Sequence, residues 1–212
     1  MTQVLSPRQR YEQDLATGVL LPDSAQASVI AEFDDLCIRL IDAAARERTM
    51  RARVQRLLGC SVTPELGLYL WGGVGRGKTH MMDAFFASLP FQRKLRMHFH
   101  RFMQRVHAGL TAHSGAKNPL ERVAAEIADE ALVLCFDEFF VSDIGDAMIL
   151  AGLIEALFAR GVALVATSNI PPSDLYKDGL QRGRFLPAIA LIEKHLKIAH
   201  LESETDYRFR TL

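Results

Sequence analysis

The order of apolar and polar positions divides the chain into a helical first part and an alternating second part. Over residues 1–60 the apolar positions recur three and four residues apart, which places side chains on one face of a helix. The clearest stripe consists of Val29, Ile30, Phe33, Leu36, Cys37, Leu40 and Ile41. We therefore expect residues 1–60 to form a helical N-terminal extension, with a boundary near Thr63-Pro64.

From about residue 66 short apolar runs alternate with segments of helical spacing. The runs expected to be strands are Leu68–Trp71, Leu95–His100, Ala131–Phe136, Val162–Thr167 and Leu196–Leu201. The helices are expected from Lys78 to about Leu89 and at Phe102–Thr111, Leu120–Asp129, Asp146–Arg160 and Phe185–His195. Such alternation predicts parallel pairing with helices on both faces. Residues 61–212 are therefore expected to form one α/β domain, a three-layer sandwich around a five-stranded sheet.

Composition and charge narrow the class of protein without naming it. The chain has 49% hydrophobic and 24% charged residues, which is typical of a globular protein rather than a disordered one. Lys plus Arg equals Asp plus Glu at 25 each, so no overall basic field attracts nucleic acid or an anionic membrane. The three cysteines lack C-x-x-C spacing, no apolar stretch approaches the ~20 residues of a membrane span, and the N-terminus does not resemble a secretory signal. A cytoplasmic protein is expected.

A local cluster of basic residues leaves nucleic-acid binding open as an alternative. Five arginines gather near the end of the extension: Arg46, Arg48, Arg51, Arg53 and Arg56. They are spread around the expected helix, which favours a solvated surface over an arm that binds nucleic acid.

The strongest motif follows the first strand of the alternating part. Residues 72–79 match G-x-x-x-x-G-K-S/T, with a strand before them and a helix after them. Glycines let successive N–H groups approach phosphate, the helix start attracts the anion, the lysine reaches the β- and γ-phosphates, and the threonine hydroxyl coordinates Mg²⁺. We assign nucleotide binding to Gly72, Gly73, Val74, Gly75, Arg76, Gly77, Lys78, Thr79 and His80.

Two carboxylates end the third expected strand. Ligand chemistry in a parallel sheet lies at the carboxyl ends of the strands. Asp137 is therefore expected near Mg²⁺, acting through a bound water, and Glu138 is expected to take the proton from an attacking water. A water-activating glutamate argues against small-molecule kinases, and the chain has no N-K-x-D element for guanine. The motifs therefore predict hydrolysis of ATP.

Three more polar residues are candidates on weaker grounds. Asn169 follows the fourth strand, where it either orients the attacking water or simply starts the turn into Pro171-Pro172. Arg182 and Arg184 lie farther along the chain. An arginine that enters the site of a neighbouring subunit would stabilise the transition state, but the residues alone favour two solvent-facing side chains.

These motifs together resemble a known family, the AAA+ ATPases of the ZapE cell-division type in bacteria, which have mitochondrial relatives. The resemblance runs from about Arg10 to the end of the chain. It is carried by Tyr69–Thr79, Asp137–Met148, Thr167–Asn169, Asp178–Pro187 and Asp206–Arg208. The first of these segments is generic to P-loop proteins, whereas the second and fourth are more particular to this family.

The resemblance implies a sheet ordered 5-1-4-3-2, hydrolysis of ATP with Mg²⁺, and a homo-oligomer with sites between subunits. It implies that Asn169 is a sensor residue and that Arg182, ahead of Arg184, is the arginine finger. It also implies a protein partner, such as the FtsZ polymer of the division ring, with peripheral association at the inner membrane. The neutral net charge leads us to expect no nucleic-acid partner.

The family continues beyond the Asp206–Arg208 element into a helical lid, and we expect that lid to be missing from these 212 residues. Two other functions stay open. One is a helicase-loader-like protein that binds single-stranded nucleic acid with ATP. The other is a scaffold that binds ATP without turnover.

Overall fold

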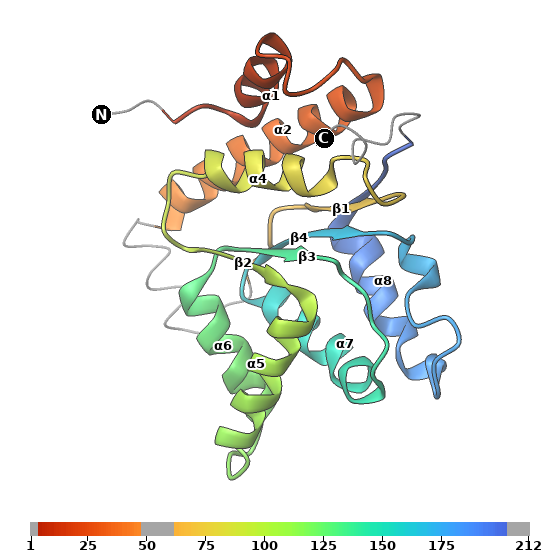
Figure 1. Cartoon of the computed structure of the whole chain (residues 1–212). Coiled ribbons are helices and arrows are strands. Elements are labelled where there is room, and N and C mark those ends of the chain that lie inside the picture. Colours follow the sequence, from red (N-terminus) through yellow and green to blue (C-terminus); the bar gives the residue numbers. More distant parts are fainter. Residues whose placement is uncertain (1–3, 48–61, 203–212) are drawn as a thin grey trace.

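The structure is a computed structural model that describes residues 4–47 and 62–202 (Figure 1). The predictions for Arg48, Arg51, Arg53 and Arg56, for Cys60 and for Asp206–Arg208 lie outside this part of the chain.

Five parallel strands form the central sheet, in the order β2-β3-β4-β1-β5. Their bounds are β1 Gly67–Trp71, β2 Lys94–His98, β3 Val133–Asp137, β4 Ala163–Ser168 and β5 Leu196–His200. This order is the expected 5-1-4-3-2 read from the other edge, and it is confirmed. Because β4 lies between β1 and β3, the phosphate loop, the acidic pair and the polar end of β4 meet at one edge.

Helices cover both faces of this sheet. Figure 1 shows α1 (Pro7–Ala16), α2 (Ser24–Glu47) and α4 (Lys78–Ser88) on one face. The other face carries α5 (Phe99–Ala112), α6 (Pro119–Glu130), α7 (Ile144–Ala159) and α8 (Leu186–His195). Two short 3₁₀ helices, η1 (Pro172–Asp174) and η2 (Arg182–Arg184), precede α8. None of the helices within residues 4–47 and 62–202 is both long and apolar enough to cross a bilayer.

Alternation along the strands divides the apolar side chains into two cores. In β1, Leu68 and Leu70 pack with α2 and α4, whereas Tyr69 packs on the opposite face. Strand β3 alternates in the same way and is buried throughout, as expected of a central strand.

The N-terminal extension packs on the first of these cores. Six positions of the predicted stripe of α2 are buried, but Ile41 is 37% exposed, so its assignment to the stripe is wrong. It follows Leu40 by one residue, and the ~100° turn per residue carries its side chain past the edge of the buried face. The start of α2 is capped by the Asp23 carboxylate, which accepts the backbone N–H groups of Ala25 and Gln26.

Several predicted boundaries are off by one or two residues, and the largest difference lies between β2 and α5. The second strand was expected to reach His100 and the next helix to begin at Phe102, but β2 ends at His98 and α5 begins at Phe99. Pairing with β3 stops at the His98–Asp137 pair. Phe99 and Phe102 are both buried three residues apart, a spacing that a helix satisfies and a strand does not.

Candidate active site

The phosphate loop connects β1 to α4 and depends on glycine at two positions. Gly72 donates its N–H to the carbonyl of Ser168 at 3.2 Å, and a Cβ on it would lie 2.5 Å from the carbonyl oxygen of Leu201. Gly77 caps α4 with φ at 86°, in the left-handed region that glycine adopts without strain. The sequence folds into a tight loop here because side chains are absent where strands β4 and β5 approach.

Lys78 points back into its own loop. Its ammonium donates to the carbonyls of Gly72 at 2.6 Å and Gly73 at 2.7 Å. Burial, and then the charge of Arg76, lower the pKa of this ammonium. A lysine ammonium carries three donors, so one remains for a phosphate oxygen.

A cleft of about 430 Å³ lies over this loop. It brings together residues from three elements that are far apart in sequence. They are the loop and the start of α4 (Val74, Gly75, Arg76, Gly77, Lys78, Thr79 and His80), Glu138 after β3, and Thr167, Ser168 and Asn169 at the end of β4. The structure therefore places Glu138 and Asn169 opposite the predicted phosphate-binding residues.

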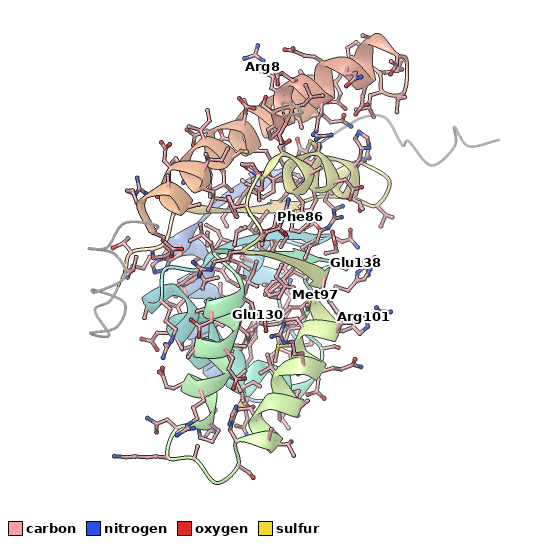
Figure 2. The ribbon with its side chains drawn as sticks, turned by 90° about the vertical axis from the view of Figure 1, so that its left-hand side faces the viewer. Arg8, Phe86, Met97, Arg101, Glu130 and Glu138 are labelled. Carbon is pink, nitrogen blue, oxygen red and sulfur yellow. The ribbon has the colours of Figure 1, made fainter. Side chains whose placement is uncertain are left out.

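Glu138 leaves the sheet through an unusual backbone conformation. Its φ is 54°, which is strained for a residue with a Cβ, and its N–H donates to the Thr167 hydroxyl at 3.4 Å. The side chain is 80% exposed, and the imidazole of His98 lies 3.8 Å from its carboxylate. Figure 2 shows Glu138 at the margin of the sheet, on the side where Arg101 of α5 also lies. The turn thus directs the carboxylate toward solvent at the cleft.

Asp137 is held differently from its neighbour. It is 8% exposed and does not line the cleft. The Arg96 guanidinium on β2 donates to both of its carboxylate oxygens, at 2.8 Å from Nε and 3.2 Å from Nη2. The third nitrogen of Arg96 donates to Asp83, one turn after Thr79 on α4. Burial lowers the pKa of the Arg96 guanidinium, but the hydrogen bonds and charges of the two carboxylates outweigh it and raise that pKa.

The comparison with known proteins settles the family. The family model for AFG1-like ATPases matches residues 5–212. The chain belongs to the AFG1-like ATPase family. Cell division protein ZapE of Escherichia coli (strain K12) is 51% identical over 217 residues, covering 99% of this chain and 58% of ZapE. Lactation elevated protein 1 homolog B of Danio rerio is 43% identical over 160 residues, covering 70% of this chain and 32% of that protein. The chain thus spans about three fifths of the first of these relatives.

Solved structures show the same fold at low identity. The crystal structure of DnaI superposes with a TM-score of 0.56 at 17% identity, covering 91% of this chain and 89% of DnaI. AMPPCP-bound DnaA from Aquifex aeolicus gives a TM-score of 0.56 at 16% identity, covering 90% of this chain and 51% of DnaA. These likenesses show the fold alone, which is the expected P-loop NTPase sandwich of the AAA+ type.

The two candidate arginines do not reach the cleft of their own chain. Arg182 and Arg184 lie in η2, and neither lines the cleft. Arg182 donates to the carbonyl of Ser173. The backbone N–H of Arg184 donates to the Gln181 carbonyl at 2.9 Å, but its exposed side chain makes no hydrogen bond or ion pair within residues 4–47 and 62–202. A role for either one in hydrolysis therefore requires a second subunit, and it stays a prediction.

Sequence reasoning missed three contacts around the site. Arg96 was overlooked, although a charged residue within a strand next to the acidic pair was a usable signal. Gln26 of α2 is 1% exposed and donates its amide to the Arg76 carbonyl at 3.2 Å. Asp14 of α1 lies 2.8 Å from His80. No local sequence pattern indicates the Gln26–Arg76 and Asp14–His80 contacts, because they join residues 50 and 66 positions apart.

These residues fit a magnesium nucleotide. The loop offers backbone N–H groups and a helix N-terminus to an anion, and Thr79, which lines the cleft, offers a hydroxyl oxygen to Mg²⁺. Asp137 does not line the cleft, so its carboxylate would act on the metal through a bound water. Lys78, Thr79, Asp137 and the loop would hold the phosphates and the metal.

Proposed function

We propose that this chain contains the ATP-hydrolysing site of its family and that hydrolysis depends on Mg²⁺. One observation carries the proposal: a single cleft brings the phosphate loop together with Glu138 and Asn169, which come from the ends of β3 and β4. A phosphate site alone would indicate binding only. A free carboxylate across the cleft supplies a base for water, which is what hydrolysis needs.

Each residue has a separate task in this proposal. Lys78 would hold the transferred phosphate by its remaining N–H, and Thr79 and Asp137 would hold the metal, which would offset the charge on the phosphate oxygens. Glu138 accepts the proton of the attacking water, and the Asn169 amide orients that water. Glu138 is suited to the task because its side chain is exposed and its single ion-pair partner within residues 4–47 and 62–202 is His98, at 3.8 Å, so no strong ion pair has to break.

The wider role follows from the curated relatives. ZapE is called a cell division protein, and the 51% identity supports the same setting for this chain. We propose a homo-oligomer that remodels a protein partner, such as the FtsZ division ring, in the cytoplasm and in peripheral contact with the inner membrane. Arg182, with Arg184 second, would act across the subunit interface. Residues 61–212 would form the catalytic core and residues 1–60 the helical extension.

Exchange of Glu138 for glutamine tests the central step. Glu138→Gln keeps the shape of the side chain and removes the base, so phosphate release should fall by about 10²-fold or more while ATP still binds. Lys78→Ala is the matched variant, because it should lose ATP binding itself. Phosphate release and titration calorimetry with ATP measure the two quantities. Full turnover in Glu138→Gln would rule out the role given to this residue.

The open alternatives give different results in the same assays. A scaffold binds ATP and releases no phosphate even as the wild type. A helicase-loader-like protein binds single-stranded oligonucleotides with an affinity that falls steeply with salt. Of the five arginines behind that second idea, only Arg46 is described, and its guanidinium pairs with Glu65 at 2.6 Å. The contacts of Arg46 therefore give no support to the nucleic-acid-binding alternative.

A further inference from the structure

Arg96 connects the two elements that carry the proposed metal ligands. It lies on β2, at the edge of the sheet, and its side chain is only 18% exposed. One side of the guanidinium binds both oxygens of Asp137, at the end of β3, and the remaining nitrogen binds Asp83 on α4. Thr79 and Asp83 are four residues apart on α4, so they share one face of that helix. Arg96 therefore spans from the strand of Asp137 to the helix of Thr79.

This contact fixes the Asp137 carboxylate in one orientation. A bidentate arginine–carboxylate pair fixes the plane of the carboxylate as well as its position, which a lysine cannot do. A carboxylate has about four lone-pair sites, so two remain after Arg96 has bound. The Asp137 side chain is 11% exposed, and within residues 4–47 and 62–202 only Arg96 hydrogen-bonds to its carboxylate.

We propose that Arg96 is the positioning residue of the metal site, with Asp83 as its second anchor. It fixes the orientation of the Asp137 carboxylate, whose remaining lone pairs would be available to Mg²⁺ or to a water bound to it, and it links α4 to β3. This inference rests on the proposed function, because it takes Thr79 and Asp137 as the residues that bind the metal. A residue that orients a metal ligand typically changes metal affinity by about 10–100-fold when it is removed.

A purely structural ion pair makes a different prediction. Its removal lowers the free energy of unfolding but affects nucleotide binding equally with and without metal. The distinguishing quantity is the Mg²⁺ effect, defined as the affinity for a non-hydrolysable ATP analogue with Mg²⁺ divided by the affinity in EDTA.

The experiment measures the Mg²⁺ effect by calorimetry on the full chain and on four variants. For Arg96→Gln we expect the Mg²⁺ effect to fall about tenfold or more, with the affinity in EDTA nearly unchanged. For Arg96→Lys the Mg²⁺ effect should fall less, because the charge stays although the bidentate geometry is lost. Asp83→Asn should cause a smaller loss, because the Asp137 pair remains. Arg93→Gln is the matched control: Arg93 lies near β2 but contacts Glu47 and the Ala128 carbonyl, so its Mg²⁺ effect should equal that of the wild type.

Each result decides a separate point. A wild type without any Mg²⁺ effect contradicts the proposed function itself. A wild-type Mg²⁺ effect that Arg96→Gln retains in full overturns the role of Arg96 and leaves the proposed function intact. Circular dichroism checks folding, because Arg96→Gln leaves Asp137 buried without its partner. If that variant does not fold, Arg96→Lys decides, and an unchanged Mg²⁺ effect there overturns the inference.

Discussion

Four residues of the candidate site hold positive φ angles: Gly72, Gly75, Gly77 and Glu138. Gly77 and Glu138 do so for different reasons. Gly77, at 86°, is the N-cap of α4, where its missing side chain lets the loop adopt the left-handed turn that leads into the helix. Glu138, at 54°, carries a side chain in the same region, which costs about 1–3 kcal/mol. Backbone N–H donation to the Thr167 hydroxyl and buried packing of Phe139 hold it there. Strain at Glu138 is thus a local cost that places a carboxylate at the cleft.

The exchange Gly77→Ala tests whether ATP binding needs the left-handed backbone conformation at this position. Alanine at φ 86° is strained, and its Cβ would lie 3.1 Å from the Gln26 amide nitrogen. We expect the free energy of unfolding to fall by about 1–2 kcal/mol and ATP affinity to fall about tenfold or more. Denaturant unfolding and calorimetry measure the two. Gly115→Ala is the control, since nothing lies within 4 Å of its added Cβ. Wild-type ATP binding in Gly77→Ala would show that the loop does not need the left-handed turn.

At the scale of elements, the N-terminal helices are bound to the phosphate loop as well as to the core. Helix α1 reaches α4 through the Asp14–His80 pair and through Arg10, whose Nε donates to Ser88 at 3.1 Å. Helix α2 places Gln26 under the loop, with its amide on the Arg76 carbonyl and its Oε1 buried without a partner in the described chain. Both N-terminal helices thus contact the predicted phosphate loop or the helix that follows it.

Removing the Gln26 amide should therefore affect ATP affinity more than the free energy of unfolding. Gln26→Leu loses one hydrogen bond to the loop but also removes the unpartnered Oε1, so the two effects on the free energy of unfolding oppose each other. We expect ATP affinity to fall about 3–10-fold and the melting temperature to change little. Gln104→Leu, at an exposed position of α5, provides the control. A large fall in melting temperature with unchanged ATP affinity would instead make Gln26 a packing residue only.

At the scale of the whole molecule, one chain does not assemble every residue that the proposal requires. The cleft contains the phosphate loop, Glu138 and Asn169, whereas Arg182 and Arg184 lie in η2, away from it. If an arginine completes the site, it comes from a second copy of the chain. Activity should then depend on assembly.

A mixing experiment tests this dependence. Specific activity of the wild type should rise with protein concentration, and Arg182→Ala should reduce it by about 10³-fold. Mixing Arg182→Ala with Glu138→Gln should restore part of the activity, because some interfaces then combine an intact Glu138 with an intact Arg182. Arg184→Ala, tested in parallel, shows which arginine acts. Activity that is independent of concentration and not restored by mixing would place hydrolysis within a single chain.

Much of this protein was predictable from residues close together in sequence. The strands were assigned correctly from local patterns, because apolar runs and strand ends act over a few residues. The phosphate loop and the acidic pair were found as short motifs, and their roles stay predictions. The boundary between β2 and α5 was placed wrongly, because an apolar run fits a strand or a helix equally until its packing partners are known. The order of the strands came from resemblance to a family rather than from any local pattern.

Tertiary structure alone decided how these parts are held. Arg96 and Asp137 are 41 residues apart and Gln26 and Arg76 are 50 apart, and only the packing of β2 on β3 and of α2 on α4 brings each pair within hydrogen-bonding distance. Sequence by itself determined which chemical groups the site contains, because those groups follow from short motifs. Their orientation was decided by long-range packing, since a carboxylate or a loop carbonyl points where its distant partner holds it.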